Sequence, residues 1–251
     1  MRKPFQGVWN IIRFNWHFYV VSIAFLCCLL LSENYLSLPT KPYLRIIELF
    51  VLVPTLVSLC VSLYVYDLSG LYQLNWIDNR SPKRPMTIVN IHAGFDETST
   101  LLASKFNEAE LWVFDFYEPE KHTEISIKRA RKAYPSFPNT KSVSTNHLPI
   151  ADNTVDMVFI IFAAHEIRDE QERITFFKEL KRIIKPTGTI VVTEHLRDFP
   201  NFLAYNIGFL HFYSRKSWLE LFQKASLSVK KEQKITAFIS SFIITKNGIA
   251  S

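Results

Sequence analysis

Two long apolar stretches near the N-terminus constrain the fold of this chain most strongly. They cover Phe14–Leu31 and Ile46–Tyr66, and the short polar segment Ser32–Arg45 separates them. Each stretch approaches the roughly 20 residues with which an α-helix crosses a bilayer. A helix satisfies its own backbone hydrogen bonds, which a hydrocarbon environment requires. We therefore predict a helical hairpin inserted in a membrane.

The basic residues around these stretches indicate an orientation. Arg2, Lys3 and Arg13 precede the first stretch, and Arg80, Lys83 and Arg84 follow the second. Lys41 and Arg45 lie between the two stretches. Lysine and arginine are in excess on the cytoplasmic side of membranes, so both ends of the hairpin are predicted to be cytoplasmic. The net charge of +6 fits an anionic lipid surface as partner. No basic and aromatic pattern of nucleic-acid binding is present, and no oligomeric state is predicted.

Two other interpretations of the hairpin remain open at this point. Glu48 and Pro54 interrupt the second stretch, so the pair could be buried helices of a soluble domain. The pair could also enter one leaflet without crossing the membrane. We divide the chain into a hairpin and interfacial segment (1–79), a linker (80–86) and a catalytic domain (87–251). The three cysteines, Cys27, Cys28 and Cys60, all lie in the apolar stretches, which excludes thiolate chemistry in the catalytic domain.

Beyond residue 86, short apolar runs alternate with helical patterns. The expected strands are Thr87–Ile91, Leu111–Asp115, Val155–Phe162 and Thr189–Thr193, and the expected helices are Thr98–Phe106, Glu120–Tyr134, Gln171–Ile184 and Ser214–Ala225. A helix stop is expected over Lys185–Gly188, and Ser228–Lys234 with Ala237–Lys246 is expected to form a closing antiparallel pair. This alternation predicts an α/β fold with a doubly wound, mostly parallel sheet. Ligands bind such sheets at the carboxyl ends of the strands.

Two segments resemble a known family. Leu148–Asp156, LPIADNTVD, resembles the LPFxDNxFD segment of class I S-adenosylmethionine-dependent methyltransferases, and Phe176–Thr193 resembles their helix–KPGG–strand unit. The resemblance covers about residues 87–246 and is strongest to the C-methyltransferases of ubiquinone and menaquinone biosynthesis. It implies a seven-stranded Rossmann-like methyltransferase fold and S-adenosylmethionine as the cofactor.

The resemblance also implies which residues contact this methyl donor: His92, Ala93, Gly94, Asp96, Asp115, Phe116, Asn146, His147 and Phe162. An acid that ends the second strand, here Asp115, can bind both ribose hydroxyls of a nucleoside. The alternative is a surface aspartate in a turn. Of the three glycines in the family's first loop only Gly94 is present, which predicts weaker donor binding. Asp96 can begin the following helix, whose amides could hold the donor's carboxylate.

Two doublets of histidine and glutamate follow predicted strands and are candidates for catalysis. His165-Glu166 follows the fourth strand, and Glu194-His195 follows the next. A histidine can take a proton from a phenol or an activated ring carbon during methyl transfer. The candidate catalytic residues are therefore His165, Glu166 and His195, although structural histidines remain the alternative. No metal-ligand spacing is present, and no metal site is predicted.

The segment Phe199–Tyr213 is aromatic and apolar. It could line a greasy substrate pocket, lie on the bilayer, or pack as a core helix. Three functional hypotheses follow. The first is a membrane-anchored methyltransferase whose acceptor is lipophilic, such as a quinone precursor, a lipid or an aryl pigment. The second is a methyltransferase fold that binds a nucleoside or a partner without turnover. The third is a soluble methyltransferase whose N-terminal helices cap the pocket.

Overall fold

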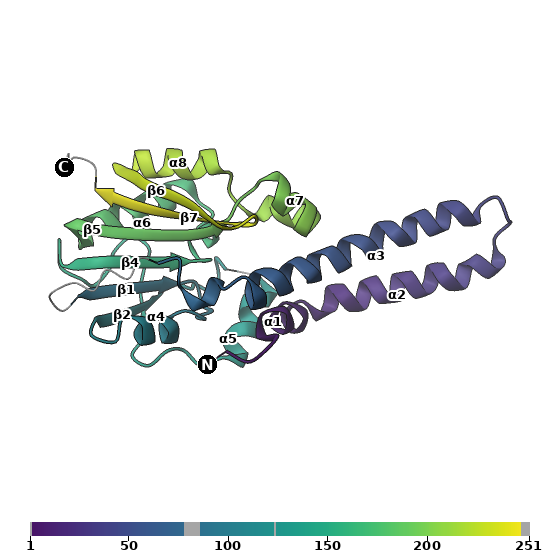
Figure 1. The fold of residues 1–251 in the computed structure, drawn as a ribbon, viewed down its shortest axis with the longest axis horizontal. Coiled ribbons are helices and arrows are strands. Elements are labelled where there is room, and N and C mark those ends of the chain that lie inside the picture. The colour runs from purple at the N-terminus through teal and green to yellow at the C-terminus, as the bar shows by residue number, and fades with distance from the viewer. Residues whose placement is uncertain (1, 78–85, 123, 247–251) are drawn as a thin grey trace.

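A seven-stranded sheet forms the body of the molecule, and a helical hairpin projects from one edge of it (Figure 1). The computed structural model describes residues 2–77, 86–122 and 124–246, so residues 80–85 of the expected linker lie outside the described residues. The strands are β1 (Thr87–His92), β2 (Glu110–Asp115), β3 (Lys141–Ser142), β4 (Val155–Ile161), β5 (Ile184–His195), β6 (Leu227–Thr236) and β7 (Ile239–Lys246). Their order is β3-β2-β1-β4-β5-β7-β6, and β7 is antiparallel to both of its neighbours. The predicted doubly wound fold is confirmed.

Both faces of the sheet are covered because alternate residues of each buried strand point to opposite sides. On one side, Val89 of β1 belongs to a buried cluster with α6 (Glu170–Ile183) and α8 (Arg215–Lys224). On the other side, Ile88 belongs to a cluster with Leu102 of α4 (Ser99–Lys105). Strands buried on both faces explain the continuous apolar runs in the sequence.

Most expected boundaries agree with the structure within about two residues, and the largest differences concern the start of α5 and the start of β5. Helix α5 spans Ile125–Ala133 and begins later than the predicted Glu120, because His122 Nδ1 accepts the Glu118 amide at 2.8 Å and holds a turn there. The expected helix stop over Lys185–Gly188 belongs instead to β5. Lys185 pairs with Asp156 of β4 at 2.6 Å, and the β4–β5 register shifts at this point, so the extra residues are accommodated in an irregular strand.

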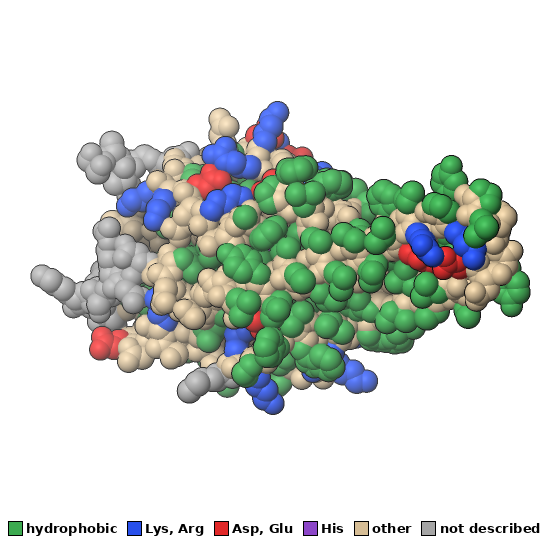
Figure 2. Space-filling model, turned by 45° about the vertical axis from the view of Figure 1, so that its right-hand side comes forward, with side chains coloured by type: hydrophobic (Ala, Val, Ile, Leu, Met, Phe, Trp, Pro, Cys, Tyr) green, Lys and Arg blue, Asp and Glu red, His purple; other side chains and the backbone are tan. Residues whose placement is uncertain are grey.

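The hairpin consists of α2 (Trp16–Ser32) and α3 (Lys41–Leu63), joined by a turn that contains the 3-10 segment η1 (Glu33–Tyr35). Both helices are long and apolar enough to cross a membrane by length and composition. In their most apolar windows only 0% and 6% of the residues are buried, so these are not core helices of the described structure. Figure 2 shows hydrophobic side chains along the hairpin and a small cluster of charged side chains near its tip. In the sequence around the turn, Arg45 pairs with Glu33 at 2.8 Å.

The base of the hairpin packs against the end of the sheet at which the carboxyl ends of the parallel strands lie. There α1 (Gln6–Phe14), the π-helical turn η2 (Tyr64–Leu68) and the 3-10 turn η3 (Leu71–Gln73) lie together. Asp67 accepts the amides of Gly7 and Val8, each at 2.8 Å. Gly7 is required by this close approach, since a Cβ atom there would lie 2.4 Å from the Tyr66 Cβ. The N-terminal region is therefore docked where a parallel sheet binds its ligands.

Candidate active site

The loop after β1 is ordered by its own side chains. Gly94 has a φ of 91°, a conformation that favours glycine. Its amide donates to Nδ1 of His92 at 3.2 Å, and the buried Nε2 of His92 has no hydrogen-bond partner among the described residues. Burial lowers the pKa of His92, although Asp96 and Asp115 oppose this. His92 is therefore neutral at physiological pH.

Asp115 ends β2 as predicted, but its carboxylate already has a partner within the chain. Arg131 of α5 makes a short ion pair with it, and the Tyr117 amide donates to it at 2.9 Å. The guanidinium also lies 4.4 Å from the centre of the Tyr117 ring. Atoms of Tyr117 and Arg131 stand 2.9–3.0 Å from the place where a Cβ atom of Gly94 would lie. The protein's own side chains thus occupy the position expected for a ribose.

This position does not fit the nucleoside of S-adenosylmethionine in the conformation observed. The cavity beside His92 and Arg131 has a volume of about 120 Å³, whereas small-molecule sites usually measure about 300 Å³ or more. Asp115 lines neither this cavity nor the larger one described below. Arg131 must therefore leave Asp115 before a ribose can bind there, and the ribose contact of Asp115 stays a prediction.

The other predicted donor contacts are scattered. Asp96 accepts the amides of Thr98 and Ser99, each at 2.9 Å, so the amides expected to hold a carboxylate are already bonded. Ala93 and Phe116 are buried in the core. Asn146 and His147 are exposed and line neither cavity. Phe162, with a φ of 53°, lines the large cavity.

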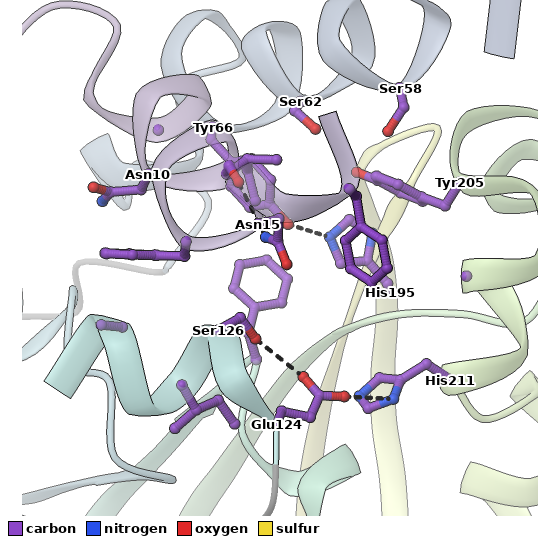
Figure 3. A pocket seen from close by; sticks show the side chains of 18 of the residues that line it. Asn10, Asn15, Ser58, Ser62, Tyr66, Glu124, Ser126, His195, Tyr205 and His211 are labelled. Atoms are coloured by element: carbon purple, nitrogen blue, oxygen red, sulfur yellow. Dashed lines mark hydrogen bonds and ion pairs between the residues drawn. The ribbon is translucent and has the colours of Figure 1, made fainter. Parts of the chain in front are cut away.

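A large cavity of about 860 Å³ lies between the base of the hairpin and the carboxyl ends of β4 and β5. Figure 3 shows the lining of the cavity. It comes from segments far apart in the sequence, including α1, the C-terminal half of α3, α5, and the segment after α7 (Phe199–Tyr205). The predicted catalytic residues His165, Glu166 and His195 all line it. Of the two doublets, three residues therefore face this cavity, whereas Glu194 is buried and does not line it.

His165 pairs both with Glu194 of the second doublet and with Glu166 of its own doublet. Successive residues at a strand end point to opposite sides, so Glu194 turns away from His195 and its Oε2 lies 2.7 Å from Nδ1 of His165. Nε2 of His165 lies 3.1 Å from Oε1 of Glu166. Burial alone would lower the pKa of His165, but the two carboxylates raise it to about 10. His165 is protonated at neutral pH in this state, and it is not the proton acceptor that the sequence suggested.

His195 has the opposite properties. Its Nδ1 lies 3.1 Å from the Phe238 carbonyl and 3.0 Å from Oδ1 of Asn201, and both of these atoms accept hydrogen bonds. Its Nε2 is consequently free to accept from the hydroxyl of Tyr66 at 2.8 Å. Burial lowers the pKa of His195 to about 4, and the ring is stacked on Phe212 with centroids 4.9 Å apart. His195 is a neutral acceptor at the wall of the cavity.

Sequence reasoning missed several of these side chains. The sequence assigned no functional role to Tyr66, which ends the second apolar stretch, or to Arg131, which lies within a predicted helix. Glu124 and His211 were not singled out. Most of the contacts that these side chains make join residues far apart in the sequence, for example Tyr66 and His195 at a separation of 129. The Arg131–Asp115 contact spans 16 residues. No local pattern encodes such contacts.

The aromatic segment after β5 serves as cavity wall and as exposed surface. It forms α7 and the 3-10 helix η5 (Asn206–His211), and α7 lies beside α3. Tyr205, His211 and Phe212 line the cavity. Phe199 and Ile207 are 69% and 79% exposed. Of the three alternatives given for this segment, the structure therefore agrees with the one in which it lines a pocket, and it excludes a packed core helix.

The sheet order, the antiparallel β7 and the cleft at the strand ends define a class I methyltransferase fold. Comparison with known proteins agrees: residues 93–192 match the family model described as "Methyltransferase domain". The ubiquinone/menaquinone biosynthesis C-methyltransferase UbiE of Haemophilus ducreyi is 32% identical over 76 residues, which cover 28% of each chain. The chain thus matches little more than a quarter of the length of this curated relative.

Solved structures show the same fold. The PH0226 protein of Pyrococcus horikoshii aligns with a TM-score of 0.52 at 17% identity, covering 71% of this chain and 90% of that one. The geranyl diphosphate C-methyltransferase of Streptomyces coelicolor, solved with Mg²⁺, geranyl diphosphate and S-adenosyl-L-homocysteine, aligns at 0.51 and 10%, covering 74% and 82%. These structures show that the chain has a methyltransferase-like fold, and residues 93–192 are similar to the methyltransferase family model.

Proposed function

We propose that this protein is a membrane-anchored methyltransferase that transfers a methyl group from S-adenosylmethionine to a lipophilic acceptor. The observation that carries the proposal is the position of the 860 Å³ cavity between the hairpin base and the ends of β4 and β5. Its wall includes side chains of both hairpin helices, namely Phe18, Tyr19, Ser22, Pro54, Thr55, Ser58 and Ser62. An acceptor dissolved in the bilayer would enter along these helices without crossing water.

Further observations support an apolar acceptor and a bilayer location. The exposed apolar side chains of α7 and η5 lie beside α3 and extend the hydrophobic surface of the hairpin towards the domain. Such a surface fits the interfacial region of a membrane. The matching curated protein is named for ubiquinone and menaquinone biosynthesis, and these quinones are lipophilic. We infer from the basic flanks that the catalytic domain faces the cytoplasm.

The residues of the cavity are suited to binding the methyl acceptor and to taking up the proton that it releases. S-adenosylmethionine, when bound, supplies an electrophilic methyl group. The chain must hold the acceptor in line and receive the proton that an oxygen or carbon acceptor releases. Neutral His195, reached through the Tyr66 hydroxyl, can receive this proton. Burial among aromatic rings excludes water from the same place.

The test compares lipid extracts from cells with and without the protein by mass spectrometry. We expect one lipid species to gain the mass of a single methylene unit only when the protein is present, and Tyr66→Phe to reduce that gain. A matched experiment extracts membranes with alkaline carbonate, and the protein is expected to stay in the pellet. Unchanged lipid profiles, together with no transfer of labelled methyl groups to the lipid fraction, would contradict the proposal.

A second candidate function is favoured by one observation. The Asp115–Arg131 pair and the small cavity beside it suit a methyltransferase fold that binds a partner without turnover. Calorimetry with S-adenosylmethionine separates the two. Binding that is lost in Asp115→Ala supports the enzyme, and the absence of binding supports the non-catalytic protein.

A further inference from the structure

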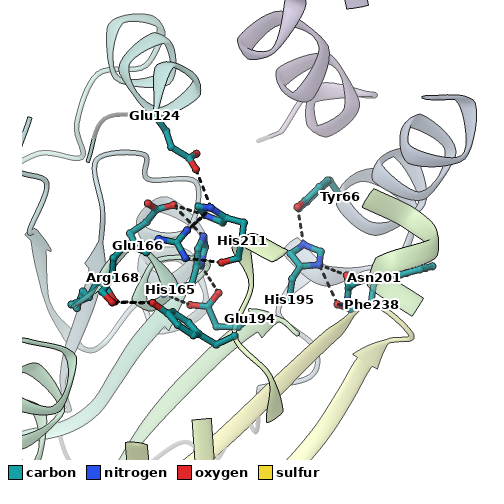
Figure 4. A network of polar contacts seen from close by, with 12 residues as sticks. Tyr66, Glu124, His165, Glu166, Arg168, Glu194, His195, Asn201, His211 and Phe238 are labelled. Carbon is teal, nitrogen blue, oxygen red and sulfur yellow. Dashed lines mark hydrogen bonds and ion pairs between the residues drawn. The ribbon is translucent and has the colours of Figure 1, made fainter. Parts of the chain in front are cut away.

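One end of the cavity gathers two histidines around a glutamate. His165, Glu166 and His211 each offer one ligand atom, and these atoms lie within 4.8 Å of one another. Oε1 of Glu166 is 3.1 Å from Nε2 of His165 and 3.5 Å from Nε2 of His211. Figure 4 shows the three side chains converging from η5 and from the 3-10 turn η4 (Ala164–Glu166) that follows β4. We propose that they form a binding site for a divalent transition-metal ion, with Zn²⁺ as the ion best suited to it.

The orientation of both imidazole rings supports this proposal. Nδ1 of His165 faces Oε2 of Glu194 at 2.7 Å, and Nδ1 of His211 faces Oε1 of Glu124 at 3.1 Å. Metal-binding histidines characteristically give their second nitrogen to a carboxylate, which fixes the tautomer and directs the other nitrogen to the metal. Here both histidines have a carboxylate at Nδ1, and both Nε2 atoms face the same carboxylate oxygen of Glu166. The Arg168 guanidinium also contacts both ring nitrogens of His211 and lies 2.5 Å from its Nε2, so Arg168 must move before an ion binds there.

The charges of the cluster are also matched to a divalent ion. With neutral imidazoles, the carboxylates of Glu124, Glu166 and Glu194 contribute three negative charges. Among the described residues in direct contact with this group, Arg168 is the one permanently positive side chain, and its guanidinium lies against the ring of His211. Two negative charges remain. These two charges describe the metal-bound state, in which both imidazoles would be neutral, and they would match the charge of a divalent ion. The side chains of His165 and Glu166 are only 11% and 9% exposed, so the ion would be largely shielded from water.

The ligand set defines the chemistry of the site. Two histidines and one carboxylate with an open fourth position are typical of catalytic zinc, and imidazole ligands suit zinc better than magnesium. The open position faces the cavity, because all three ligands line it. If the proposed function holds, a hydroxyl or enol oxygen of the acceptor would bind the ion as an anion, and its proton would pass through the Tyr66 hydroxyl to His195. The ion would then position that oxygen for methylation.

The experiment uses the full-length protein in detergent, stripped of metals with a chelator and titrated with ZnCl₂ by calorimetry. Metal analysis after gel filtration gives the stoichiometry. We expect one zinc ion per chain. Glu166→Gln and His211→Ala should weaken binding at least about tenfold, and so should Glu194→Gln, which removes only a supporting carboxylate. Arg168→Ala should bind zinc more tightly, since it removes a competing cation.

The matched control is His147→Ala, which removes an exposed histidine 3.8 Å from a carboxylate outside the cavity. It should bind zinc like the parent chain. Zinc binding that is absent, or equally tight in the parent and in Glu166→Gln, would overturn the proposal. Thermal unfolding of each variant verifies folding, and the gain expected in Arg168→Ala cannot result from misfolding. Because zinc is titrated without donor or acceptor, the site can be confirmed even if methyl transfer is not observed.

Discussion

The pair between Arg131 and Asp115 leads to a specific prediction about donor affinity. Arg131 covers the carboxylate that the donor's ribose needs, so binding must first separate the two side chains. Replacing Arg131 with alanine removes this competition. The Arg131 side chain is 35% exposed and that of Asp115 is 9% exposed. Solvent at the arginine therefore weakens the interaction below that of a fully buried pair.

The size of the effect follows from the strength of this ion pair. A hydrogen bond to a charged group contributes about 1.5–3 kcal/mol, and partial exposure reduces this to about 1–2 kcal/mol. Since 1.4 kcal/mol corresponds to a factor of ten, Arg131→Ala should bind S-adenosylmethionine about tenfold more tightly. Without the donor the variant should be less stable, because Asp115 loses its main partner.

The assay is calorimetric titration of the detergent-solubilised protein with S-adenosylmethionine. Lys132→Ala is the control, since it removes one exposed positive charge from the same helix without a contact to Asp115. Asp115→Asn in the Arg131→Ala background should remove most of the gained affinity. An affinity in Arg131→Ala that is equal to or below that of the parent chain would refute the reasoning. So would an equal gain in the lysine variant, which would indicate a general charge effect.

Three further predictions concern the hairpin base and His195. The folded-state pKa of His195 of about 4 lies below its unfolded value of about 6.5. The unfolded chain therefore binds this proton first, and stability is lost as the pH falls from about 6.5 to about 4, by about 3 kcal/mol. In His195→Gln the slope of unfolding free energy against pH in this window should decrease, and an unchanged slope would contradict the assignment. Gly7→Ala should lower the unfolding temperature, because the new Cβ atom would lie 2.4 Å from the Tyr66 Cβ and push α1 away from it. Gly208→Ala should leave the unfolding temperature unchanged, because the nearest atom to its new Cβ lies at 3.7 Å. Tyr66→Phe should reduce the rate of methyl transfer about a hundredfold while donor affinity stays the same, and equal losses in both would show a purely structural role.

The hairpin and the sheet could be predicted from the sequence because each follows from a local pattern. Length and composition define the apolar helices, and continuous apolar runs define strands that are buried on both faces. The doublets His165-Glu166 and Glu194-His195 could be placed at ligand-facing strand ends for the same reason. The start of α5 and the extended Lys185–Gly188 segment could not, because a side-chain bond and a neighbouring strand decide them.

Sequence alone determined that this chain combines an apolar hairpin with a methyltransferase-like sheet, and it placed the candidate catalytic residues at the ends of two strands. Tertiary structure decided what those residues do. Folding brings Glu194 into contact with His165, Tyr66 into hydrogen-bond distance of His195, and Arg131 into an ion pair with Asp115. The physical reason is that a side chain's charge and hydrogen bonding depend on partners brought together by folding, which no spacing along the chain specifies.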